Sequence, residues 1–169
     1  METKRLKIEK ISMDYLDDIN EFVTDQDTCK YMMFLPNKDK EEAKKYIQDV
    51  LDGWDKPNPC EHVFVLILDN KVIGNLYIYF EENNSAELGW IINKKFQNMG
   101  YAYESVSELI KYATKEYGIK HFVAHCDKDN APSWHLMEKL GMKKVGEYGG
   151  RINRSSDEEK IELAYELNI

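Results

Sequence analysis

The segment at residues 90–103 has the residue types of an anion-binding turn. Its order, Trp-Ile-Ile-Asn-Lys-Lys-Phe-Gln-Asn-Met-Gly-Tyr-Ala-Tyr, predicts a strand, a polar turn and the start of an amphipathic helix. Gly100 and Ala102 place small residues where the chain must turn and leave its amides uncovered. The N–H groups of residues 98–103 then lack intrahelical acceptors and lie at the positive end of the helix dipole, which suits a pyrophosphate. A ligand-free strand-to-helix turn would use the same glycine, and for this segment taken alone that ordinary interpretation is favoured.

Periodicity predicts the elements that must position this turn. Alternating apolar residues predict strands, apolar residues three or four apart predict helices, and Asp39 followed by Glu42 resembles a helix-capping box. Gly53 and Gly118 are predicted to end two of the helices. The expected strands lie at 6–8, 62–68, 72–80, 86–92, 121–126, from 145 and at 161–167, and the expected helices at 12–23, 39–52, 102–117 and 132–140.

The order of these elements favours an α/β (α+β) fold. Three consecutive strands precede a strand–helix–strand crossover, which implies a mixed sheet with helices on both faces. No repeat, low-complexity tract or linker-like change of composition divides the chain. Residues 1–169 are therefore expected to form a single domain.

Composition limits the classes of function. The chain has 169 residues, with 23 Lys and Arg against 31 Asp and Glu, and a formal net charge of −8. This balance argues against nucleic-acid binding and leaves room for a cationic substrate, although residues 94–144 carry nine Lys against six acidic residues. Three cysteines without metal-ligand spacing, no signal-peptide core and no long apolar run predict a reduced, cytoplasmic protein with no membrane partner.

Further motifs give the turn a family context. Gln97-x-x-Gly100-x-Ala102 is similar to motif A of the GNAT superfamily of acetyl-CoA-dependent N-acetyltransferases. The segment Asn-Ala-Pro-Ser-Trp-His-Leu-Met-Glu-Lys-Leu-Gly-Met at 130–142 resembles the family's next motif, and residues 4–6, 69–74 and 87–90 are similar to its RimJ/RimL-like branch. The resemblance covers nearly the whole chain and implies the GNAT fold, a mostly antiparallel mixed sheet that splays apart at the cofactor site.

The resemblance also implies how acetyl-CoA would be held. Main-chain groups of the expected strand at 86–92 would pair with the pantetheine amides, so that the pantetheine arm adds to the strand edge like a further strand. The amides of the turn would hold the pyrophosphate, and a side chain before the next helix would bond the pantetheine arm. The expected cofactor-binding residues are Trp90, Ile91, Ile92, Gln97, Asn98, Met99, Gly100, Tyr101, Ala102, Tyr103, Asn130 and Ser133.

The expected catalytic residues are Ser133 and Glu87. Many family members protonate the leaving thiolate with a tyrosine, but the matching residue here is Met137, which cannot donate a proton. The RimL-like branch is assigned a serine in that role, and Ser133 matches it, although a hydroxyl there could equally cap the helix. Glu87 could orient or deprotonate the substrate amine, or be an ordinary solvated carboxylate. Further candidates, in a loop that often walls the acceptor pocket, are Glu147, Tyr148 and Arg151.

Other reactive residues receive ordinary interpretations. His121 and His125 are four apart on a strand, roughly 13 Å, so they cannot share a metal directly, and no metal is expected. Cys126 has no histidine partner spaced to activate it and is expected to be a small buried core residue. The Met-Met-Phe-Leu run at 32–35 is expected to be a buried packing patch, or else to line an acceptor pocket.

Together these observations predict an N-acetyltransferase that uses acetyl-CoA as co-substrate. A primary amine, from a small molecule or a peptide N-terminus, would attack the thioester directly, and homodimers are frequent in the resembling family. The alternative is a CoA-binding sensor domain without catalysis, which the residue at 137 favours. A nucleotide-binding α/β module is disfavoured because the chain lacks the three-glycine dinucleotide fingerprint and its acidic ribose ligand.

Overall fold

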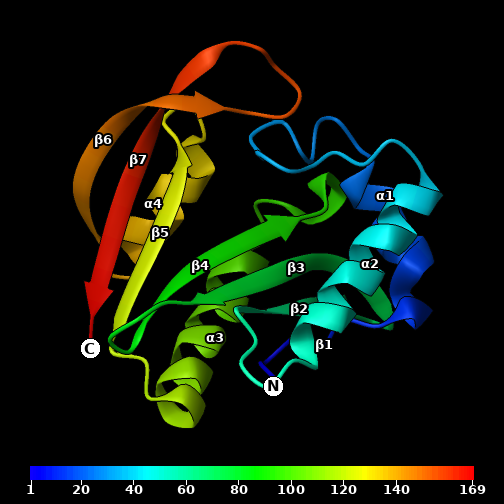
Figure 1. Ribbon diagram of the computed structural model, residues 1–169, viewed down its shortest axis with the longest axis horizontal. Coiled ribbons are helices and arrows are strands. Elements are labelled where there is room, and N and C mark those ends of the chain that lie inside the picture. Colours follow the sequence, from blue (N-terminus) through cyan, green and yellow to red (C-terminus); the bar gives the residue numbers. More distant parts are fainter.

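Seven strands form one mixed sheet in the order β1-β2-β3-β4-β5-β7-β6 in the computed structural model, which describes residues 1–169 (Figure 1). Every neighbouring pair is antiparallel except β4 and β5, which are parallel. The strands are β1 (Lys7–Lys10), β2 (Glu61–Leu68), β3 (Lys71–Phe80), β4 (Ser85–Ile92), β5 (His121–Asp127), β6 (Lys143–Ile152) and β7 (Glu159–Asn168). The helices are α1 (Leu16–Val23), α2 (Lys40–Trp54), α3 (Tyr101–Tyr117) and α4 (Ala131–Lys139), with short 3₁₀ turns at Met13–Tyr15 and Lys94–Phe96.

Local sequence signals account for the ends of the long helices. The Asp39 side chain caps α2 by accepting from the Glu42 amide at 2.9 Å, as the capping box predicts. The predicted stop at Gly53 is wrong by one residue, because α2 continues to Trp54. Helix α3 is bounded by Gly100 and Gly118, whose φ angles of 83° and 69° are left-handed and favour glycine.

Strand β6 corrects one expectation about the acceptor wall. Glu147, Tyr148 and Arg151 were expected in a loop, but they lie within β6 and pair with β7. The glycines of this segment make its sequence look turn-like. The strand accommodates them through register shifts between Lys144 and Gly146 and between Tyr148 and Arg151, so that extra residues bulge without ending the pairing.

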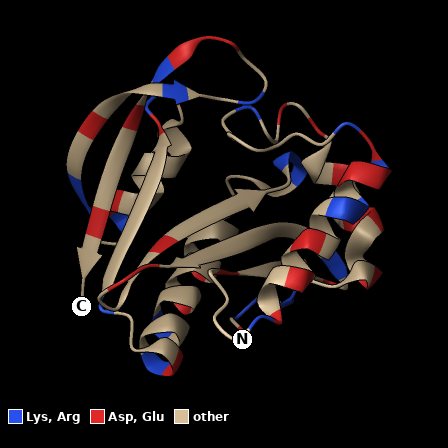
Figure 2. Ribbon diagram, viewed as in Figure 1, with Lys and Arg blue, Asp and Glu red and all other residues tan.

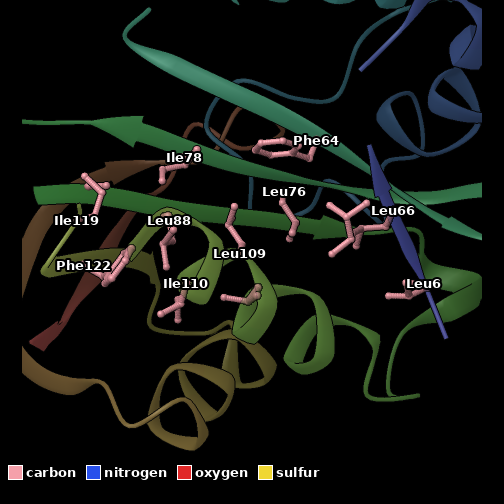
Figure 3. Packing of buried hydrophobic residues seen from close by; sticks show 14 of the residues in the cluster. Leu6, Phe64, Leu66, Leu76, Ile78, Leu88, Leu109, Ile110, Ile119 and Phe122 are labelled. Carbon is pink, nitrogen blue, oxygen red and sulfur yellow. The ribbon is translucent and has the colours of Figure 1, made fainter. Parts of the chain in front are cut away.

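Hydrophobic clusters lie on both faces of the sheet, as the mixed fold requires. On one face α3 packs through Leu109 and Ile110 against side chains of the central strands, including Leu76 and Leu88 (Figure 3). On the other face α1 and α2 cover a second cluster that includes Tyr77 and Ile91. A smaller cluster joins α4 to β5 and β7 through Met137, Cys126 and Leu163. Met137 is fully buried there, so the position where the family often has a tyrosine is a packing position in this chain.

The sheet separates between β4 and β5, and this opening positions the site. The two strands pair only from Ser85 to Glu87 and from His121 to Val123. Beyond that point β4 remains paired with β3 and β5 with β7, so the two strands diverge (Figure 1). The splayed sheet expected from the resemblance is therefore present. No helix in the chain combines the length and the apolar character that crossing a bilayer demands.

Candidate functional site

A cavity of about 630 Å³ occupies the opening between β4 and β5. Its wall is formed by β4, the turn into α3, the end of β5, the start of α4 and the segment between α1 and α2. Met99 does not line it; its side chain is exposed. The other predicted residues all line the cavity, namely Glu87, Trp90, Ile91, Ile92, Gln97, Asn98, Gly100, Tyr101, Ala102, Tyr103, Asn130 and Ser133.

The turn before α3 presents a run of free amides to this cavity. Asn98 and Gly100 have left-handed φ angles of 62° and 83°, which turn the chain sharply before the helix. The first helical hydrogen bond runs from the Glu104 amide to the Gly100 carbonyl, and the N–H groups of residues 98–103 donate to no protein acceptor. Consecutive free amides at a helix N-terminus form a concave anion site. The turn is thus shaped for a phosphate group.

Arg5 braces this turn from the N-terminal segment. Its Nη1 donates to the Met99 carbonyl at 2.9 Å, its Nε donates to Glu104 at 2.7 Å, and its guanidinium lies 4.4 Å from the centroid of the Tyr101 ring. Burial opposes ionisation of Glu104, but hydrogen bonds from Thr3 and Arg5 outweigh it and keep the pKa of that carboxyl below its ordinary value. Sequence reasoning assigned Arg5 no role, because its partners lie more than ninety residues away.

The edge of β4 supplies main-chain groups to the same cavity. From Leu88 to Ile92 this strand pairs with β3 on one side and with no strand on the other. Gln97 ties the end of the strand to the turn, because its Nε2 donates to the Ile92 carbonyl at 2.9 Å. An extended ligand with amides can add to such an unpaired edge.

Glu87 and His125 form a hydrogen-bonded pair in the cavity wall. The distance between Glu87 Oε1 and His125 Nδ1 is 2.9 Å, and both side chains are about one-third exposed. This hydrogen bond raises the pKa of His125, against the opposing effect of its burial. Glu87 is therefore not an isolated solvated carboxylate. A carboxylate–imidazole pair can orient an amine and take up a proton.

His125 is the functional candidate that sequence reasoning missed. The two histidines were weighed only as metal ligands, and no group of three or more His, Cys, Asp or Glu side chains is placed to hold a metal ion. His121 lies outside the cavity wall and bonds Ser85 and Glu166. The parallel register places Glu87 beside Val123, so His125 lies two residues further along the same face.

Ser133 lies in the first turn of α4 without capping it. The cap position is Asn130, and Ser133 is the third helical residue, so the interpretation of Ser133 as the helix cap is wrong. Its backbone amide donates to the Asn130 carbonyl at 3.0 Å. Burial raises the pKa of the neighbouring Cys126 thiol to about 11, although the Ser133 hydroxyl opposes this rise. Cys126 is buried as expected, and its protonated thiol is a poor nucleophile.

The segment between α1 and α2 forms a further part of the cavity wall. Met32, Met33 and Phe34 line it, and the last two side chains are exposed, so this run is cavity wall and only its Leu35 is buried core. The segment is tied to β6, because Arg151 donates to the Tyr31 carbonyl at 2.9 Å.

Of the three candidates on β6, Arg151 alone reaches the wall. It is buried and paired with Glu162 at 2.6 Å. Glu147 pairs with Lys128 and Lys144 outside the cavity, and Tyr148 is an exposed surface residue. Arg151 thus ties this part of the cavity wall to β6 and β7.

Comparisons with known proteins agree with this geometry. A family model described as an acetyltransferase (GNAT) domain matches residues 5–143. An uncharacterized N-acetyltransferase of Bacillus subtilis, YnaD, is 31% identical over 150 residues, which covers 85% of this chain and 82% of that protein. A GNAT-family acetyltransferase of Bacillus anthracis has a TM-score of 0.84 at 26% identity and covers 99% of this chain and 97% of its own. RimL, a ribosomal-protein alpha-N-acetyltransferase solved in complex with coenzyme A, shares the fold with a TM-score of 0.87 at 17% identity, over 99% of this chain and 96% of its own. The chain therefore belongs to the GNAT family of acetyltransferase enzymes.

Proposed function

We propose that this enzyme transfers the acetyl group of acetyl-CoA to a primary amine at the opening between β4 and β5. The observation that carries the proposal is that six consecutive free amides, at residues 98–103, and the unpaired edge of β4 meet in one cavity. The first suits the pyrophosphate of acetyl-CoA and the second suits its pantetheine amides. The relative RimL was solved with coenzyme A, which supports the same choice of co-substrate.

Different residues along the cavity would bind the pantetheine arm and the phosphates of acetyl-CoA. Main-chain groups of Trp90, Ile91 and Ile92 would pair with the pantetheine arm, and the Asn130 side chain would bond it from the other side of the opening. Lys139, which lines the cavity with its Nζ 4.4 Å from the centroid of the Tyr103 ring, would add positive charge near the phosphates. We assign residues 1–169 to a single acetyltransferase domain that acts in the cytoplasm, where its three free cysteines would stay reduced.

Transfer would proceed by direct attack. The amine must lose a proton before its nitrogen can attack, and the Glu87–His125 pair is placed to accept that proton. The nitrogen–carbon bond forms and the carbon–sulfur bond breaks, so acetyl passes to the amine and the electron pair leaves with sulfur. The hydroxyl of Ser133 would protonate the thiolate, and the proton that Ser133 loses would be replaced from solvent.

The acceptor would be a small-molecule amine or a peptide N-terminus. RimL, by its description, acts on the N-terminus of a ribosomal protein, which supports an acceptor of that kind. Here Met32, Met33 and Phe34 line the same cavity as Glu87 and make part of its wall apolar and aromatic. Such a wall suits an amine carried on an apolar chain.

An amine panel tests this proposal. Purified enzyme is incubated with acetyl-CoA and each amine, and free thiol and acetylated amine are measured together. Equal amounts of the two products with at least one amine are expected. Binding of acetyl-CoA without thiol release from any amine in a broad panel would instead indicate a sensor domain.

A further inference from the structure

A second cavity, of about 580 Å³, adjoins the first and shares part of its wall. Phe34, Tyr77 and Tyr79 line both cavities. The rings of Phe34 and Tyr77 meet edge to face with 5.7 Å between centroids, and those of Tyr77 and Tyr79 are parallel. The far side of the second cavity is formed by α2 and by the first residue of β2, Glu61. A ligand that fills both cavities would therefore cross an aromatic wall.

Glu61 and Glu87 stand on the same face of the sheet at the two ends of one row. Glu61 pairs directly with Tyr79, and Tyr79 pairs directly with Glu87, so β2, β3 and β4 present carboxylate, phenol and carboxylate side by side. Residues paired in this way on adjacent strands are about 5 Å apart, which places the two glutamates about 10 Å apart. Charged residues are otherwise sparse along β3 and β4 and frequent on α1 and α2 (Figure 2).

Glu61 is the carboxylate of the second cavity that has no cationic partner. Asp49 pairs with Lys45 at 2.5 Å, and Glu42 pairs with Arg154 at 3.5 Å, so the other two acidic side chains of this wall are compensated. Glu61 takes part in no ion pair of the structure and is partly buried beside aromatic rings. A lone carboxylate in such surroundings favours a cation supplied by a ligand.

Two buried polar groups in the same wall also lack partners. Tyr77 is 3% exposed and its hydroxyl has no hydrogen-bond partner; Asn37 is 6% exposed and its side-chain nitrogen Nδ2 has none. A buried polar atom without a partner is costly and uncommon in native proteins. The Tyr77 hydroxyl can accept a hydrogen bond from a ligand ammonium.

We infer that the acceptor is an amine with a second cationic group, which binds Glu61 in the second cavity while the reacting nitrogen lies at Glu87. This inference rests on the proposed function and specifies its substrate class: an aminoalkyl chain that spans about 10 Å between nitrogens, as in a linear diamine or polyamine. The chain between the nitrogens packs on Phe34 and the two tyrosines. The reaction at the first nitrogen is the transfer described above.

A matched pair of amines and a single substitution test the inference. Diaminoheptane spans the required distance, and octylamine replaces its second ammonium by a methyl group. Wild-type enzyme is expected to acetylate diaminoheptane, and Glu61→Gln to raise its KM by about tenfold, because a charge-assisted contact is lost. The same substitution should leave the KM for octylamine and the acetyl-CoA affinity unchanged. Glu61→Asp, which keeps the charge, should recover part of the loss.

Controls separate this inference from the proposed function. Glu116→Gln makes the same chemical change on α3 and should leave the KM for both amines unchanged. Equal melting temperatures of wild type and variants would exclude misfolding as the cause of a raised KM. The inference is overturned if Glu61→Gln affects both amines equally or neither, or if diaminoheptane is not acetylated while another amine is. Absence of acetyl-CoA binding would contradict the proposed function, and the inference would fall with it.

Discussion

Glu87 and His125 join the two strands at the point where the sheet opens, with 2.9 Å between Oε1 of one and Nδ1 of the other. Glu87 is the last residue of β4 that pairs with β5, and His125 lies two residues beyond Val123, the last residue of β5 that pairs with β4. The pair therefore links the feature that creates the cavity, the divergence of two parallel strands, to the group that would remove a proton from the acceptor. Five predictions test this pair and the features around it.

Replacing Glu87 should lower the rate of acetyl transfer without changing the affinity for acetyl-CoA. Glu87→Gln keeps the shape of the side chain but removes its charge and its role as acceptor. We expect kcat to fall by about a hundredfold while the acetyl-CoA dissociation constant stays constant, because the free amides of residues 98–103 are untouched. Steady-state kinetics and calorimetric titration measure the two quantities. Unchanged kcat with a weakened acetyl-CoA affinity would show that Glu87 belongs to the cofactor site instead.

The Glu87–His125 pair should also make stability depend on pH. The pKa of His125 is raised in the folded protein, first by its hydrogen bond to the Glu87 carboxylate and further by the charges of Glu87, Glu162 and Glu81, while burial opposes these effects. A raised pKa contributes stability that is complete below the unfolded value, about 6.5, and is lost as the pH rises through the folded value. The stability difference between wild type and Glu87→Gln should therefore be larger at pH 6 than at pH 9. NMR titration should find a lower pKa for His125 in the variant; an unchanged pKa would contradict the coupling.

Arg5 should control the affinity for acetyl-CoA without contacting the reacting atoms. Arg5→Ala removes the brace on the Met99 carbonyl and on Glu104. We expect the acetyl-CoA dissociation constant to rise by about tenfold, which corresponds to about 1.4 kcal/mol, because the free amides lose their fixed positions. Lys4→Ala is the control for loss of a neighbouring positive charge. Equal affinity in Arg5→Ala and wild type, measured by calorimetric titration, would show that the turn holds its shape alone.

Two methionines should respond oppositely to truncation. Met137 is fully buried, so Met137→Ala should lower the free energy of unfolding by about 2–5 kcal/mol through loss of packing. Met33 is 52% exposed in the cavity wall, so Met33→Ala should change stability by less than about 0.5 kcal/mol and raise the KM for an apolar amine. Denaturant unfolding and acceptor kinetics test both. An unchanged free energy of unfolding in Met137→Ala, or a clearly lowered one in Met33→Ala, would contradict the assignment of Met137 to the core and Met33 to the cavity wall.

Sequence reasoning succeeded where structure is local. The turn at residues 98–103 and the start of α2 at Asp39 depend on neighbours within a few positions, and both lie where the sequence predicted them. It failed where distant segments meet. The Glu87–His125 contact depends on the register of two parallel strands joined through α3, and the Arg5 brace depends on docking of the N-terminal segment. No periodicity encodes either relationship.

Two further errors came from expectations that tertiary structure overrode. The resemblance places Glu147, Tyr148 and Arg151 in a loop, yet β7 supplies a partner strand for this segment and the extra residues bulge without ending the pairing. Ser133 has a residue type that favours a cap, but the chain enters α4 at Asn130, three residues earlier. The position of a cap is set by where the chain turns, and here β5 ends just before it.

The central claim is that the free amides at the start of α3 bind the pyrophosphate of acetyl-CoA, and one calorimetric titration tests it most directly. Ala102 is the second residue of α3 and lines the cavity, so Ala102→Glu places a negative charge where a helix tolerates it and a phosphate does not. Ala102→Gln introduces a side chain of nearly the same size as glutamate but without charge, so it controls for the steric effect of the substitution. We predict that acetyl-CoA binds Ala102→Glu at least about tenfold more weakly than Ala102→Gln, with equal or higher melting temperature. Equal acetyl-CoA affinities in the two variants would contradict the claim.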